Sequence, residues 1–193
     1  IDEIFSKNSA SDSLDIDFSN LAIRNINISS AYNDCVDVSS GIYEFKNLLL
    51  KNCGDKAISI GEKSSVDIDS VEAKNSNLGI ASKDSSFTKI QNAKIENVKI
   101  CLSAYKKKQE FNGSKIILNS MSCENFFLKT DIDFNSNITL NNKRLDSYEF
   151  GNIYNFKDMI ISNKDEKDNP INLLSGVETF NKKNSLNAVV EIS

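Results

Sequence analysis

The sequence predicts an all-β solenoid, in which short strands stack coil upon coil, and two observations support this prediction. The first is an apolar position that recurs every 22 residues, at Leu14, Val36, Ile58, Ile80 and Leu102. The second is the alternation of apolar and polar residues within each unit, as in Leu14–Asp17 and Val36–Val38. Alternation with a period of two indicates strands. Short strands in a unit of this length are typical of the coils of a parallel β-helix.

The two columns that flank this apolar column also hold the same kind of residue from coil to coil. The preceding column is small throughout and comprises Ser13, Cys35, Ala57, Gly79 and Cys101. The following column is polar or small and comprises Asp15, Asp37, Ser59, Ala81 and Ser103. A second apolar column comprises Ile1, Ile23, Phe45, Ile68, Ile90 and, after an insertion, Ile117. We therefore expect equivalent residues of successive coils to stack about 4.8 Å apart.

Polar columns mark the expected turns. One comprises Asn8, Ser30, Asn52, Asn75, Asn97 and Asn125, and another comprises Asn25, Asn47, Ser70, Asn92 and Asn119. Stacked Asn side chains can hydrogen-bond along the axis as a ladder. Asp12, Asp34 and Asp55 are expected at a further turn, because Asp tolerates unusual backbone angles and accepts hydrogen bonds from nearby amides.

The repeat divides the chain into two regions. Coils are clear over residues 1–125, with an insertion between Lys99 and Gly113, and residues 126–193 are irregular. Within the irregular region, Ile138–Asn141 and Met159–Asn163 are expected to form degenerate coils. The remainder is expected to cap the C-terminal end, because an open coil exposes unpaired amides and carbonyls.

The N-terminal end begins in the middle of a coil, because Ile1 shares a column with Ile23. We expect preceding residues that continue the repeat or cover the edge, since an uncovered edge invites edge-to-edge association.

The composition excludes several kinds of chemistry. The 193-residue chain contains no His, so a His base, a Ser-His-Asp triad and a His-ligated metal are excluded. A net charge of −4 with interspersed signs argues against a nucleic-acid partner. No apolar run approaches the roughly 20 residues of a membrane-inserted helix. The four cysteines form no CxxC pair, so we expect small buried thiols rather than a zinc site, and no cofactor is required.

Five segments resemble the right-handed parallel β-helix repeat family of bacterial surface and secreted proteins: SDSLDIDF, NDCVDVSSG, GDKAISIGEKS, GIASKDSS and AYKKKQEF. The resemblance covers residues 1–125. The wider family includes polygalacturonases, pectate and alginate lyases, C5-epimerases and phage tailspikes. It implies an extracellular or cell-surface location and polysaccharide as the substrate class, but it does not select a reaction.

The enzyme pattern most similar to this chain is that of the polygalacturonases, N-x-D-G-I-D followed one coil later by G-D-D. Asn33–Asp37 and Gly54–Lys56 match it in part, with Lys56 in place of the second Asp. The family's His and Arg-x-Lys motifs are absent, and Arg24 and Arg144 are the only arginines in the sequence. Hydrolysis by that mechanism is therefore not expected, nor is lyase chemistry with an Arg base.

Alternation predicts an outward strip made of two columns. One is Asp15, Asp37, Ser59, Ala81 and Ser103, and the other is Asp17, Ser39, Gly61, Lys83 and Tyr105. Small residues form its floor, acids crowd its N-terminal end, and Lys83 and Tyr105 lie at the far end. Such a groove could hold an extended sugar chain. The substrate contacts would be Ser39, Ser59, Gly61, Glu62, Asp84 and Lys106.

The acidic end of the strip has three interpretations. Asp15 and Asp37 are expected about 5 Å apart on adjacent coils, which suits the carboxylate pair of a retaining glycosidase. The same close spacing suits a Ca²⁺ ion bound by Asp15, Asp17 and Asp37. The third interpretation is a solvated acidic edge that has no role. Stacked carboxylates repel each other, so an uncompensated pair favours a bound proton or cation.

Lys83 and Tyr105 are candidates for the base and acid of a lyase or epimerase, because both can transfer protons without His. A solvated charge ladder is the simpler interpretation, with Glu62 and Asp84 pairing with Lys83 and Lys106 across neighbouring coils.

Two functions of different classes follow. The preferred one is binding or processing of a polysaccharide by an extracellular bacterial β-helix, acting as a lyase, epimerase or glycoside hydrolase if it is an enzyme. The alternative is a non-catalytic structural or adhesion module of a larger surface protein. The sequence does not decide the oligomeric state.

Overall fold

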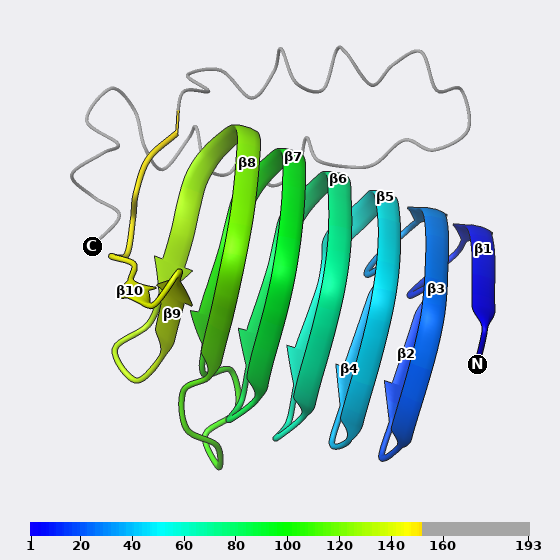
Figure 1. Ribbon diagram of the computed structural model, residues 1–193, viewed down its shortest axis with the longest axis horizontal. Coiled ribbons are helices and arrows are strands. Elements are labelled where there is room, and N and C mark those ends of the chain that lie inside the picture. Colours follow the sequence, from blue (N-terminus) through cyan, green and yellow to red (C-terminus); the bar gives the residue numbers. More distant parts are fainter. Residues whose placement is uncertain (152–193) are drawn as a thin grey trace.

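The computed structural model describes residues 1–151 and shows an all-β parallel solenoid of about six turns, as the sequence predicts (Figure 1). In the sheet, the strands follow the order β1-β3-β5-β6-β7-β8-β9-β10, and the short strands β2 and β4 pair with each other beside β5. The strands are β1 Glu3–Ser9, β2 Leu14–Asp17, β3 Asn20–Ala31, β4 Val36–Ser39, β5 Ile42–Gly61, β6 Ser65–Lys83, β7 Phe87–Tyr105, β8 Lys115–Ile132, β9 Asn137–Leu140 and β10 Lys143–Arg144.

The register confirms the 22-residue repeat. The predicted apolar column pairs strand by strand, in the order Leu14, Val36, Ile58, Ile80 and Leu102. The last four of these residues are fully buried. Leu14 is only partly buried, because β2 pairs with β4 on one side alone.

The insertion lies between Tyr105 and Lys115, and it shifts the register from the predicted one. Ile90 pairs with Leu118, which is fully buried, and Ile117 pairs with Lys89. The predicted assignments of Ile117 and Asn119 are therefore wrong, and Ser120 takes the place of Asn119 beside Asn92. The spacing of a column does not reveal the length of an insertion. Strand alternation in the next coil is what places Leu118 in the core.

The Asn ladder is confirmed. Its six predicted members all have positive φ, between 53° and 68°, a region that Asn adopts more easily than most residues. Asn75 donates to Asn52 at 2.8 Å, Asn97 to Asn75 at 3.1 Å and Asn125 to Asn97 at 3.0 Å. The side-chain amides therefore support the turn in coil after coil.

The cysteines form two disulfides, Cys35–Cys53 and Cys101–Cys123, so the prediction of free thiols is wrong. Their Cα atoms are 5.3 and 6.5 Å apart, within the range that a disulfide spans. The two cysteines of each pair come from different columns that face each other across a narrow core. Spacing along the sequence shows which residues share a column but not which columns face each other.

The first coil replaces part of the apolar interior with hydroxyl groups. Ser6 and Ser9 stand in register with the buried Ile28 and Ala31. Together with Ser13 they form a hydrogen-bonded triangle, with Oγ–Oγ distances of 3.3, 3.0 and 2.6 Å. These mutual hydrogen bonds give the N-terminal end of the core a polar closure that the sequence prediction did not include.

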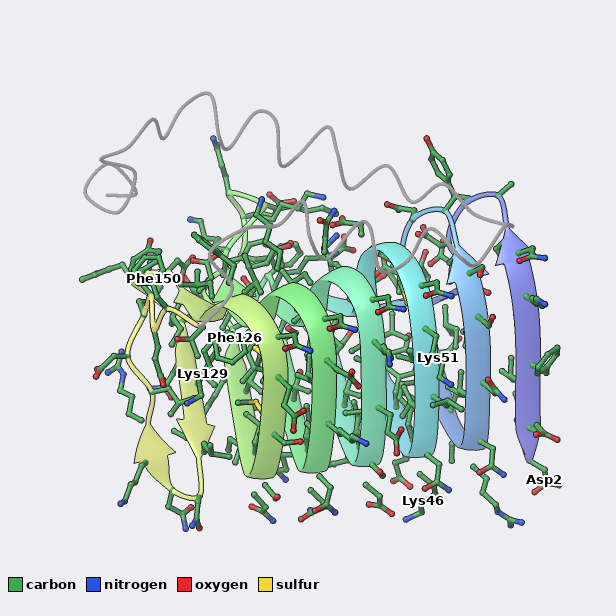
Figure 2. All side chains as sticks on the ribbon, turned by 90° about the horizontal axis from the view of Figure 1, so that it is seen from above. Asp2, Lys46, Lys51, Phe126, Lys129 and Phe150 are labelled. Carbon is green, nitrogen blue, oxygen red and sulfur yellow. A yellow bond between two sulfur atoms is a disulfide. The ribbon has the colours of Figure 1, made fainter. Side chains whose placement is uncertain are left out.

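The described C-terminal residues return antiparallel along β8. Gly151 donates its amide to the Phe127 carbonyl at 2.7 Å, and Lys129 donates to the Glu149 carbonyl at 2.7 Å. Figure 2 shows Phe126, Lys129 and Phe150 gathered at this end. The segment pairs with the edge of the last long strand, as a cap must. The predicted coil Met159–Asn163 lies outside the described residues.

Candidate functional site

The structure brings the two outward columns together on β2, β4, β5, β6 and β7, and we call these columns the outer strip. In the first column, Asp15 pairs with Asp37, which is followed in register by Ser59, Ala81 and Ser103. In the second column, Asp17 pairs with Ser39, Ser39 with Gly61, and Lys83 with Tyr105. Because parallel pairing stacks these residues on neighbouring coils, the strip follows the axis of the solenoid.

The acidic end of the strip is accessible. Asp15 and Asp17 are exposed and Asp37 is partly exposed, and the Asp17 carboxylate accepts a hydrogen bond from the Ser39 hydroxyl. Partial loss of hydration raises the pKa of the exposed Asp15 carboxyl, and the charges of Asp17 and Asp37 raise it further, while Lys83 acts in the opposite direction. The carboxylates therefore repel one another, as their spacing predicts.

The middle of the strip is covered rather than open. The Lys83 ammonium group donates to Ser59 Oγ at 2.6 Å and lies 3.8 Å from Asp37 Oδ1. Its side chain runs over Gly61, where an added Cβ would lie 2.8 Å from Lys83 Cε. Ser59 and Ala81 are fully buried, and Lys83 itself is only 8% exposed. The expected accessible floor at Ser59, Gly61 and Ala81 is therefore wrong, because alternation predicts direction but not what covers a small residue.

The predicted ion pairs at the turn are also wrong. Glu62 pairs with Lys108, and the Lys106 ammonium group donates to the Gln109 carbonyl. Asp84 is fully buried, and its Oδ1 accepts the amides of Lys107 at 2.7 Å and Lys108 at 2.8 Å. Glu62 and Asp84 thus anchor the inserted loop. The repeat could not predict these contacts, because the insertion has no counterpart in other coils.

Beside the strip lies a buried ion pair that the repeat pattern did not predict as part of a site. Asp34 is 2% exposed, and its Oδ1 accepts the Lys56 amide at 2.9 Å and lies 3.5 Å from Lys56 Nζ. Burial raises the pKa of Asp34 to about 6, although Lys56 opposes the shift. Burial alone would lower the pKa of Lys56, but Asp34 and Asp55 outweigh it and the net direction is upward.

Tyr105 lies within electrostatic reach of this pair. Burial raises the pKa of the Tyr105 hydroxyl, the charge of Lys56 lowers it, and Asp55 and Asp34 raise it again. The charges of the Asp34–Lys56 pair therefore reach the far end of the outer strip at Tyr105.

One signal in the sequence could have identified this pair. Lys56, not Asp55, occupies the column of Asp12 and Asp34, since the Asp34 amide donates to Asp12 Oδ1 and the Lys56 amide donates to Asp34 Oδ1. Asp55 instead stands beside Asn33, to whose carbonyl it donates at 3.0 Å. A cation that follows two acids in one column indicates a stacked ion pair.

The calcium hypothesis stays a prediction. Within residues 1–151, no group of three or more Asp, Glu, Cys or His side chains is arranged to hold a metal ion. The three strip carboxylates would have to adjust around an ion, which is consistent with weak binding alone.

We expect millimolar Ca²⁺ to raise the melting temperature of the wild type, because an ion bound only to the folded state stabilises it. Asp37→Asn should remove the increment. Calorimetry with Ca²⁺ and with a chelator checks this, and Asp69→Asn, exposed and paired with Lys46, serves as the control. Melting temperatures that do not respond to Ca²⁺ would contradict the prediction.

No helix long and apolar enough to cross a membrane occurs in the part of the chain that the structure describes. Comparisons with protein-family models, with curated proteins and with solved structures found no match.

Proposed function

We propose that the outer strip binds an extended polysaccharide and does not turn it over. The observation that carries the proposal is the strand register that stacks Asp15 beside Asp37 and Asp17 beside Ser39, with accessible carboxylates at this end of the strip. A sugar chain that lies across this end of the strip meets side chains of neighbouring coils about 4.8 Å apart. The strands hold these positions in place before binding, which lowers the entropy cost of association.

The chemistry of the accessible residues favours particular sugars. The carboxylates of Asp15, Asp17 and Asp37 can accept hydrogen bonds from sugar hydroxyls, and such charge-assisted bonds are stronger than neutral ones. The same charges repel uronic acids and attract protonated amino sugars. Neutral or amine-bearing polymers are therefore the preferred ligands of the strip.

The candidate acid and base are poorly placed for turnover. The Lys83 ammonium group already contacts Ser59 and Asp37, so a substrate would have to displace it from a nearly buried position. Burial raises the pKa of Tyr105, which makes it a poorer proton donor at neutral pH. Binding at the acidic end of the strip requires neither group to move.

The proposed location is extracellular or at the cell surface. Two disulfides suit an oxidising compartment and are rare in proteins of the reducing cytosol.

A glycan array followed by titration tests the proposal. Asp17→Asn/Asp37→Asn should bind at least about tenfold more weakly than the wild type, because each lost charge-assisted hydrogen bond weakens binding. The matched control, Asp2→Asn/Asp69→Asn, changes the net charge equally at two exposed ion pairs away from the strip. No glycan binding by the wild type, or equal losses in both variants, would contradict the proposal.

A structural or adhesion role is the second candidate, and the covered middle of the strip favours it. Ser59 and Gly61 offer no open floor, whereas the Asn ladder, the disulfides and the continuous core suit a stiff spacer. Absence of binding across the array, together with high resistance to unfolding, is the outcome that this role predicts.

A further inference from the structure

The inserted loop and the neighbouring turns form a second, cationic surface, distinct from the outer strip. Figure 1 shows the connection between β7 and β8 projecting beyond the stacked coils. The surface, which we call the cationic corner, comprises Lys63, Phe87, Lys106, Lys107, Phe111 and Lys115. Its four lysines are exposed and its two rings are partly exposed.

Hydrogen bonds and strand pairing hold these residues on adjacent turns and strands, and Phe87 donates its amide to the carbonyl of Ser64, next to Lys63, at 2.8 Å. Lys63 donates its amide to the Asp84 carbonyl at 2.9 Å, and Asp84 Oδ1 accepts the Lys107 amide at 2.7 Å. Phe87 pairs in register with Lys115. The loop is held firmly, because the Asn112 amide donates to Ser85 Oγ at 2.8 Å and the Ser85 amide donates to the Asn112 carbonyl at 2.9 Å.

The rings and the ammonium groups lie together. Lys63 Nζ is 5.7 Å from the centroid of Phe111, and Lys115 Nζ is 5.7 Å from that of Phe87. Both distances allow a cation–π interaction. Amphipathic segments that lie in the interface of a membrane combine lysines with apolar side chains that include Phe.

Positive charge predominates at this corner of an acidic chain. The chain as a whole carries −4. At the corner, Glu62 is paired with Lys108 and Asp84 is fully buried. The partly exposed Asp133 accepts the Lys106 amide at 2.6 Å, and Glu110 is the exposed carboxylate of the loop itself. Each lysine near an anionic membrane surface contributes about 1 kcal/mol of attraction.

We propose that the cationic corner docks the solenoid onto an anionic lipid surface, without insertion. A convex, projecting surface suits a flat partner, whereas a single polymer chain is better held by a groove. The lysines contact lipid phosphates, and the rings lie at the level of the headgroups. This inference does not depend on the function proposed for the outer strip.

Co-sedimentation with vesicles tests the proposal. The wild type should bind vesicles of phosphatidylcholine that contain about one third phosphatidylglycerol. The partition coefficient should fall steeply between low salt and 0.5 M NaCl, because salt screens the attraction between the lysines and the lipid phosphates. Lys106→Gln/Lys107→Gln should lower the partition coefficient by about tenfold to thirtyfold. Lys7→Gln/Lys51→Gln, with the same change in charge at exposed positions on another face, should leave it nearly unchanged.

Three outcomes would overturn the docking proposal. They are equal binding to pure phosphatidylcholine vesicles, equal losses in both lysine variants, and displacement of the vesicles by polygalacturonate at low concentration, which would show that the corner binds an acidic glycan. The glycan titration of the strip variant is a separate measurement, so either proposal can fail while the other stands.

Discussion

Ile58→Ala is expected to lower the free energy of unfolding by about 2–5 kcal/mol, through lost burial and the cavity left behind. Ile58 is fully buried and lies in register between Val36 and Ile80, which are also fully buried. The coils above and below cannot collapse into the gap without breaking their strand pairing. Urea denaturation of the variant and the wild type measures the difference.

Ile42→Ala is the matched control, because Ile42 is 57% exposed on the same strand, β5. It should cost much less than Ile58→Ala, since surface substitutions stay within about 0.5 kcal/mol. Equal losses in the two variants would mean that the coil register is wrong.

Lys56→Gln is expected to be the most damaging change near the outer strip. It leaves the Asp34 carboxylate buried without its counter-charge, and such a loss costs about 3–5 kcal/mol. Asp34→Asn/Lys56→Gln should recover much of that stability, because it removes the buried charge as well. A double variant as unstable as Lys56→Gln would contradict this role of the ion pair.

The effect should depend on pH, because the pKa of Asp34 in the folded protein is raised from 3.8 to about 6. A raised carboxyl pKa means that the folded state binds the proton more tightly, so this group lowers stability as pH rises from about 4 to 6. Without Lys56 the pKa rises further. The penalty of Lys56→Gln should therefore be larger at pH 8 than at pH 5, as denaturation at the two pH values will show.

The sequence predicts the fold well because every coil of a solenoid places equivalent residues in the same environment. Val36, Ile58, Ile80 and Leu102 occupy the same environment, so their common spacing reveals strand pairing directly. The Asn ladder is predictable for the same reason, because one side-chain type satisfies one turn geometry repeatedly. Prediction failed at the insertion, where Leu118 rather than Ile117 faces the core, because a unique segment has no second copy to compare.

The candidate site was predicted less well, because its properties depend on contacts between columns. Alternation gives the direction of Ser59 and Gly61, but it does not reveal that Lys83 lies across them. The disulfide between Cys35 and Cys53 likewise depends on which columns face each other. The repeat in the sequence does not show which residues a long side chain covers, nor which columns meet in the interior.

The central functional claim is that a polysaccharide lies along the outer strip, and an NMR titration tests it most directly. Amide shifts would be followed while the best glycan from the array is added to the wild type. We expect the largest perturbations to cluster on β2 and β4, at Asp15, Asp17, Asp37 and Ser39, and to extend toward Lys83. Perturbations confined to the Lys46–Asp69 face or to the inserted loop, or none at saturating glycan, would contradict it.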